Sequence, residues 1–238
     1  MRNQLCVHRS SSLLFMLSLL VTIGFAEAKG PRLPAPDPER GAIAVTVRGR
    51  FPLGQKSPAI QVYFVRLAED ADMYSAESVI ASDFSKGKQV YLLNAKPGRY
   101  VAVAARLRNQ AAFVAAGDYV VFFDRALIPQ TAIEVTAGRI AFMGDLAVDL
   151  KVKMSEADEA QMHYLRLVEP EAARMGFMGR ALSHEYMYRG ELIELDREAA
   201  TEKAFWTLAR AKIFAGAPDW RGKVEQQLEQ QLAANLDR

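Results

Sequence analysis

The chain has 238 residues, of which 50% are hydrophobic and 24% charged, and its 30 Lys and Arg side chains nearly balance 28 Asp and Glu. These proportions are typical of a folded domain. They exclude a wholly disordered chain, a collagen-like repeat and a disulfide-rich miniprotein. Because the formal net charge is only +2, we expect no broad basic surface and no nucleic-acid partner.

The first 28 residues have the pattern of a cleavable signal peptide. Arg2 and Arg9 form a basic start, an apolar run extends from Leu13 to Phe25, and Ala26-Glu27-Ala28 fits a small-x-small cleavage site. We therefore expect residues 1–28 to be a signal peptide and the protein to be periplasmic or extracellular. An uncleaved membrane anchor is the alternative interpretation.

Cleavage after Ala28 would remove Cys6, the single cysteine of the chain. The mature protein is therefore expected to have no disulfide and no thiol-based metal or catalytic site. No later segment reaches the roughly 20 apolar residues of a membrane-spanning helix, so we expect no transmembrane segment after cleavage of the leader.

Residues 29–41 form a Pro-rich segment with prolines at positions 31, 34, 36 and 38. Proline lacks a backbone donor and favours extended polyproline geometry. We interpret the segment as a tether that leads into the first strand.

Residues 42–152 are predicted to form a β domain. Apolar residues alternate with polar or small residues in short runs, and Gly, Pro, Asn and Asp bound these runs. Such short, evenly spaced strands favour an antiparallel sandwich. The predicted strand runs are 43–47, 60–64, 90–92, 100–104, 119–123, 133–135, 140–143 and 146–150.

Residues 153–238 are predicted to form a helical C-terminal region that packs on or beside the β domain. The pattern predicts helices over 155–168, 197–214 and 219–236, whereas glycines at positions 176, 179 and 190 leave 171–196 ambiguous. The expected fold is therefore α+β, an antiparallel β-sandwich followed by C-terminal helices.

One turn in the β domain carries a family resemblance. In QVYLLNAKPGRYVAV, Pro97 presets a turn angle, Gly98 supplies a positive φ, and Tyr100 begins the next strand. This Pro-Gly-x-Tyr turn between apolar strands resembles transthyretin-like and carboxypeptidase-regulatory-like β-sandwiches. The later stretch IEVTAGRIAFMGDLAV is similar to domains of unknown function in bacterial envelope lipoproteins. The resemblance implies a transthyretin- or Ig-like sandwich over residues 42–150 and no catalytic residues.

A group of methionines and one histidine offers the best metal-ligand pattern. Met175 and Met178 are followed by His184 and Met187, and thioether and imidazole ligands suit Cu(I). The alternative is that these methionines fill gaps between helices and strands. A periplasmic copper-binding protein is therefore one candidate function.

The catalytic motifs that we considered are incomplete. His184-Glu185 begins a zinc-protease motif, but Tyr188 occupies the position of the second histidine. The chain also lacks a Gly-x-Ser-x-Gly elbow and a Gly-rich phosphate loop. An acidic loop at Glu69, Asp70 and Asp72 lacks the glycine that an EF-hand needs.

These observations favour an exported, non-catalytic cell-envelope protein without a cofactor. We expect it to be a protein- or surface-binding accessory module whose partner is another envelope protein or a surface polymer. An exported hydrolase with a site assembled from distant residues remains a second alternative. We also expect Gly98→Val to cost more stability than Gly190→Val, because valine resists a positive φ.

Overall fold

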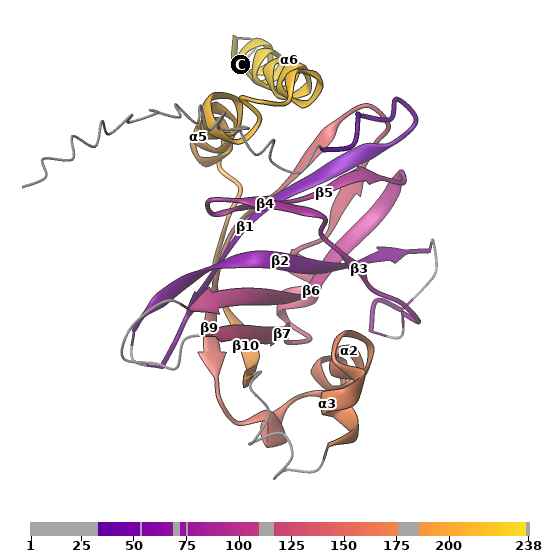
Figure 1. The fold of residues 1–238 in the computed structure, drawn as a ribbon, viewed down its shortest axis with the longest axis vertical. Coiled ribbons are helices and arrows are strands. Elements are labelled where there is room, and N and C mark those ends of the chain that lie inside the picture. Colours follow the sequence, from indigo (N-terminus) through magenta and orange to yellow (C-terminus); the bar gives the residue numbers. More distant parts are fainter. Residues whose placement is uncertain are drawn as a thin grey trace, which may run out of the picture. The chain divides into compact units, whose positions relative to one another are not determined.

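The computed structural model describes the chain from Leu33 onward (Figure 1). The predicted signal peptide and the start of the predicted tether lie outside the described residues. The described ranges are 33–52, 54–68, 72–74, 76–109, 117–175 and 186–236.

Six strands close into a β-barrel. Around the barrel they follow the order β1, β2, β6, β7, β10, β9, and β9 pairs again with β1. The β1–β9 and β7–β10 pairs are parallel, and the other four pairs are antiparallel. The barrel strands are β1 (Gly41–Arg50), β2 (Lys56–Leu67), β6 (Gly98–Asn109), β7 (Gly117–Phe123), β9 (Ile140–Lys151) and β10 (Tyr186–Asp196).

The predicted antiparallel β-sandwich is therefore wrong, and with it the transthyretin- or Ig-like arrangement. The predicted strand runs all fall within observed strands, but strand positions alone do not determine how strands pair. The missing element is β10, which lies in the glycine-containing segment of the region predicted to be helical. It links β7 to β9 and so closes the barrel.

The sheet splits at β1, because this strand changes partner halfway along one edge. Its first half pairs with β5 (Gln89–Ala95), whereas its last three residues pair with β2. The edges of β2 and β5 therefore diverge and leave a wedge between them. The short strands β3 (Ile80–Ala81) and β4 (Phe84–Lys86) cross this wedge, since β3 pairs with β2 and β4 pairs with β5.

The barrel interior is a packed apolar core. Strand alternation places one set of side chains inside, including Val47 of β1, Leu107 of β6, Val121 of β7 and Val148 of β9, all of which are fully buried. At one end, the rings of Phe51, Tyr119 and Tyr188 contact one another in the core, with centroids 5.1–5.8 Å apart.

The short helix α1 (Leu127–Gln130) follows β7 and therefore lies at the other end of the barrel. Leu127 and Ile128 are completely buried there. Thr131, which follows α1, donates through Oγ1 to the Ile128 carbonyl and accepts from the Ala102 amide. Beside it, β8 (Ile133–Val135) pairs with the start of β6.

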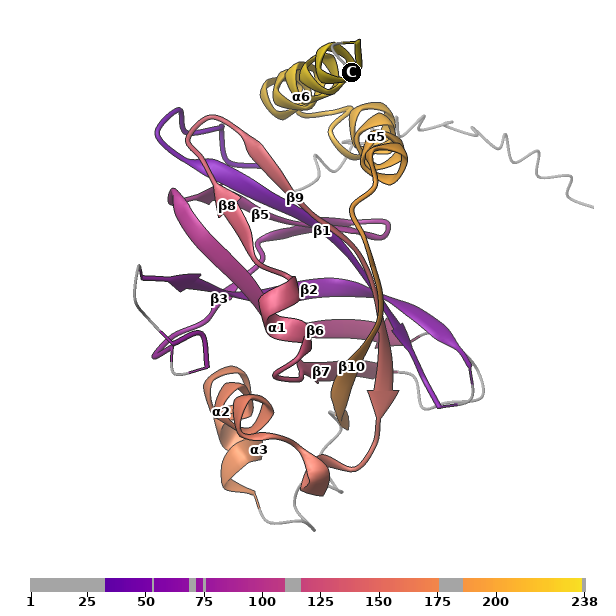
Figure 2. The same cartoon turned by 180° about the vertical axis from the view of Figure 1, so that it is seen from behind.

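Two groups of helices cover different parts of the barrel's outer surface (Figure 2). The first comprises the 3₁₀ turn η1 (Met154–Glu156), α2 (Glu159–Val168) and α3 (Pro170–Arg174). Asp158 and Gln161 form a capping box at the start of α2, and Gln161 also donates to the Phe122 carbonyl of β7. The helix is thereby fixed against the outside of the barrel.

The second group comprises α5 (Ala199–Leu208), the π-helical turn η2 (Ala209–Ile213) and α6 (Pro218–Leu236). These helices share a separate buried cluster with β1, β5 and β9, which includes Tyr91, Trp206 and Phe214. Gln89 of β5 donates to the Phe205 carbonyl of α5 and accepts from the Tyr91 hydroxyl. A buried polar side chain therefore sets the position of α5 on the barrel.

Candidate functional site

Charged side chains follow the outer face of β9 and continue onto both of its neighbours. In the strand register Arg50 of β1 and Glu191 of β10 both face Asp149 of β9, and Lys151 of β9 faces Arg189 of β10. Because alternate residues of β9 are buried in the barrel, this outward set is solvent-accessible and polar.

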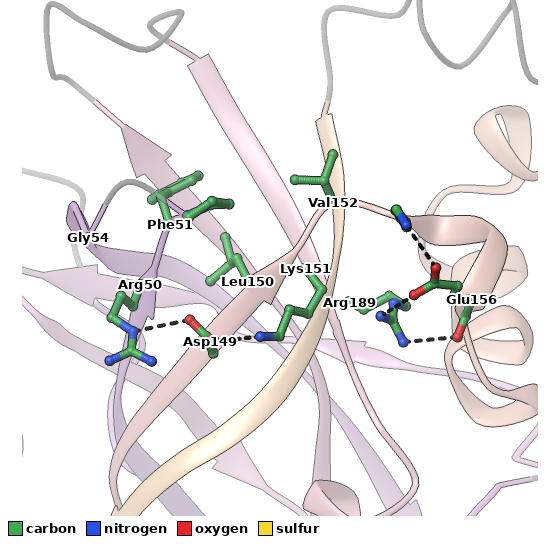
Figure 3. A pocket seen from close by; sticks show the side chains of 11 residues that line it. Arg50, Phe51, Gly54, Asp149, Leu150, Lys151, Val152, Glu156 and Arg189 are labelled. Atoms are coloured by element: carbon green, nitrogen blue, oxygen red, sulfur yellow. Dashed lines mark hydrogen bonds and ion pairs between the residues drawn. The ribbon is translucent and has the colours of Figure 1, made fainter.

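An open cleft of about 690 Å³ lies at the end of this face (Figure 3). The ends of β1 and β9, the start of β10 and η1 contribute its walls. Its charged residues are Arg50, Asp149, Lys151, Lys153, Glu156 and Arg189, and its apolar residues include Phe51, Leu150 and Val152.

Two carboxylates organise the cations of the cleft. Asp149 accepts from Arg50 Nε at 3.1 Å and from Lys151 Nζ at 2.8 Å. Glu156 contacts Arg189 Nη2 at 3.2 Å and Lys153 Nζ at 3.3 Å. Four cations thus share two carboxylates among the lining residues. A third carboxylate, Glu191, lies outside the lining at 3.7 Å from Lys151 Nζ and 4.0 Å from Arg189 Nη2.

Arg189 is the most constrained of these cations. Its Nη1 donates to the Glu156 backbone carbonyl at 2.9 Å, and its Nε is buried without a hydrogen-bond partner in the described part of the chain. An unpaired buried donor is costly, and this nitrogen is inaccessible to solvent.

The two aspartates of β9 have opposite electrostatic surroundings. Burial raises the pKa of Asp145 above its ordinary value, although the charge and hydrogen bond of Arg48 oppose this increase. Burial also acts on Asp149, but hydrogen bonds and charges from Arg50 and Lys151 together hold its pKa below the ordinary value. The cleft carboxylate is therefore the more acidic one.

We expect Asp145 and Asp149 to titrate on opposite sides of the ordinary aspartate pKa. Folding lowers the pKa of Asp149, so ionised Asp149 stabilises the folded protein when the pH is above the pKa that Asp149 has in the unfolded state. This stabilisation is lost as the pH falls through the pKa that Asp149 has in the folded state. The raised pKa of Asp145 has the opposite effect, because its contribution is present below the unfolded pKa and lost as the pH rises through the folded pKa.

Carboxyl-carbon NMR titration measures both midpoints in one sample. Arg48→Gln provides the matched perturbation, since Arg48 pairs with Asp145 at 2.9 Å and does not line the cleft. We expect it to raise the midpoint of Asp145 further and to leave that of Asp149 unchanged. Coincident midpoints in the unsubstituted protein would contradict these assignments.

The predicted metal ligands are only partly described by the structure. Met187 is 9% exposed and belongs to the main core, whereas Met175 follows α3 and is 42% exposed. Met178 and His184 lie outside the described residues, so the copper hypothesis stays a prediction. Within the described ranges, no group of three or more His, Cys, Asp or Glu side chains is arranged to hold a metal ion. Of the predicted acidic loop, Glu69 and Asp70 also lie outside them.

The predicted turn lies between β5 and β6. Gly98 has a φ of +138°, and the Tyr100 hydroxyl donates to the Lys96 carbonyl at 2.8 Å. Arg66 of the neighbouring β2 donates through Nε and Nη2 to the Pro97 carbonyl. The turn is therefore held by side chains from two strands.

Sequence reasoning missed the charged cleft. The outward positions of β9 are visible as charged residues between apolar ones in AVDLK, at Asp149 and Lys151. Arg189 occupies an outward position in YMYRGEL, but the neighbouring glycine obscured the strand. The alternation of charged and apolar residues indicates which side chains of each strand point outward. It does not indicate that β1, β9 and β10 pair with one another and so bring these side chains together.

Comparisons with known proteins add no further information about the site. No protein-family model matches the chain, and neither a curated protein nor a solved structure matches it. In the part of the chain that the structure describes, no helix is both long and apolar enough to span a membrane.

Proposed function

We propose that this protein is an exported, non-catalytic binding module of the cell envelope, and that it binds its partner at the charged cleft. Export rests on the basic start, apolar run and small-x-small site of residues 1–28. Binding at the cleft rests on the geometry of the described residues, which is independent of the leader.

The observation that carries the proposal is an exposed apolar side chain surrounded by charges. Val152 is 60% exposed at the cleft, the highest value among the large hydrophobic side chains described as exposed. Arg50, Lys151 and Arg189 line the same cavity. An apolar contact point with a polar rim is the usual organisation of a protein-binding surface.

The charge balance favours an acidic partner. Asp149, Glu156 and the adjacent Glu191 orient the lining cations before binding. The lining residues themselves include four cations and only two carboxylates. Oriented charges increase association rates and selectivity more than they increase affinity. We therefore propose another envelope protein with an acidic surface segment as the partner.

Site-specific photocrosslinking in the native host tests this function. A photoreactive phenylalanine analogue replaces Val152, and the matched control replaces Leu208, which is 40% exposed on α5 and remote from the cleft lining. We expect a discrete protein adduct at position 152 and none at position 208. Lys151→Glu should reduce the adduct at position 152, because it reverses a cation of the lining.

Three outcomes would contradict the proposal. Equal adducts at positions 152 and 208 would indicate nonspecific contact. An adduct that contains surface polymer and no protein would overturn the choice of partner. Recovery of the protein from the cytoplasm at its uncleaved mass would overturn export, for which the expected mass is that of residues 29–238.

A further inference from the structure

A second cavity lies in the wedge between β2 and β5, away from the charged cleft. It has a volume of about 410 Å³ and shares no lining residue with the cleft. The divergence of β2 and β5 from β1 creates the wedge. Between β3 and β4, Ser82 holds the chain against β2, because its amide donates to the Val62 carbonyl and its hydroxyl accepts from the Val62 amide.

The lining of this cavity combines cations with an apolar floor. Its charged residues are Arg40, Arg66 and Lys96, and no carboxylate is among the described lining residues. Its apolar and aromatic lining residues are Ile80, Leu92, Leu93, Ala95 and Tyr100. Of the three cations, only Arg40 has a carboxylate partner in the described chain, Asp37 at 3.3 Å.

Arg66 is held in place without a carboxylate. Its Nε and Nη2 donate to the Pro97 carbonyl at 3.1 and 2.8 Å. A Cβ at position 98 would lie 3.0 Å from Nε, so Gly98 allows the guanidinium to lie directly against the turn. Since a guanidinium has five N–H donors, this arrangement leaves donors available while fixing its orientation.

The charges of Arg66 and Arg40 also influence the pKa of Tyr100, which lines the same cavity. Burial raises the pKa of Tyr100, and the charges of Arg66 and Arg40 oppose that increase. A second constraint on Arg40 is its 3.2 Å hydrogen bond to the Asn94 carbonyl.

We propose that the wedge is a binding site for a small organic carboxylate with an apolar body. The carboxylate would lie between Arg66 and Lys96, for which the described lining residues provide no carboxylate partner. The apolar body would contact Ile80, Leu92 and the Tyr100 ring. The volume is that of a small-molecule pocket, and a few oriented polar groups on an apolar lining are typical of such pockets.

NMR titration of the ¹⁵N-labelled full chain with benzoate tests this site. We expect saturable shifts of the Ile80 and Lys96 amides, and none with benzamide, which has nearly the same shape but no charge. Arg66→Gln and Lys96→Gln should each weaken benzoate binding about tenfold or more, because each removes a charge-assisted contact. Lys96→Gln leaves the Arg66–Pro97 hydrogen bonds in place, so it tests the charge without altering the turn.

Arg99→Gln is the matched control, because Arg99 is exposed on β6 and does not line the wedge. It should leave the dissociation constant for benzoate unchanged. Equal binding of benzamide, or unchanged benzoate binding in both Arg66→Gln and Lys96→Gln, would overturn the proposal. Equally tight binding of inorganic phosphate would overturn the apolar part of the site. The partner crosslink at position 152 is independent of all these results.

Discussion

Gly190→Ala is expected to destabilise the protein by about 2–3 kcal/mol, and Gly190→Val by about 3 kcal/mol or more. Gly190 faces the barrel interior from β10, and an added Cβ would lie 2.8 Å from Val121 Cγ2 and 2.9 Å from Val148 Cγ1. Both contacts are with buried side chains of neighbouring strands, so the barrel wall would have to move. Urea unfolding followed by circular dichroism measures the loss.

Gly222→Ala is the matched control for this substitution. Gly222 lies in α6, and a Cβ there would meet nothing within 4 Å. Alanine has the higher helix propensity, so the control should be stabilised by about 0.5–1 kcal/mol. If Gly190→Ala were as harmless as Gly222→Ala, the inward orientation of β10 would be wrong.

The contacts in the structure lead us to expect the opposite order of stability loss for Gly98→Val and Gly190→Val from the one that the sequence predicts. At Gly98 the strain is a φ of +138° and a contact with the flexible end of Arg66, which can move away. Backbone strain of this kind costs about 1–3 kcal/mol. At Gly190 the φ is not in the left-handed region, but the neighbours are packed core atoms that cannot move independently.

Trp206→Ala is expected to lower the free energy of unfolding by about 3–5 kcal/mol. Trp206 is completely buried in the cluster that joins α5 and α6 to the barrel, and its indole donates to Glu202 at 2.9 Å. Its ring contacts Phe142 of β9 and Phe205 of α5, with centroid distances of 6.1 and 4.9 Å. The substitution therefore removes contacts between the helical layer and the barrel.

Leu208→Ala in the same helix is the control, because Leu208 is 40% exposed and its loss should change stability by no more than about 0.5 kcal/mol. Limited proteolysis gives a second measurement, since Trp206→Ala should expose sites within 199–236 before the barrel is cut. Equal stability of the two variants would contradict the role of this cluster in holding the helices.

The sequence predicted secondary structure well where one local signal dominates. Apolar alternation located β1 and β7, and the turn at Pro97 and Gly98 was visible from residue type alone. The last helix was also predicted, although its observed start is Pro218. These features depend on neighbouring residues, so a short window contains their physical cause.

The candidate site was less accessible to prediction. Arg50, Asp149 and Arg189 come from three strands, and 99 residues separate the first from the second. The predicted helix over 155–168 also began too early, because Asp158 caps α2 and several nearby residues are of types that favour a helix start. Local preferences do not distinguish between such alternatives when the adjacent barrel determines where the helix begins.

Local sequence patterns were enough to predict that residues 42–152 are rich in strands, that helices follow, and that one turn needs Gly98. The parallel pairing of β1 with β9, the closure of the barrel by β10, the charged cleft and the wedge are apparent only in the folded molecule. Alternation specifies which side chains are buried, whereas strand pairing depends on distant backbone partners. Many pairings bury the same apolar residues, and the complete fold selects one of them.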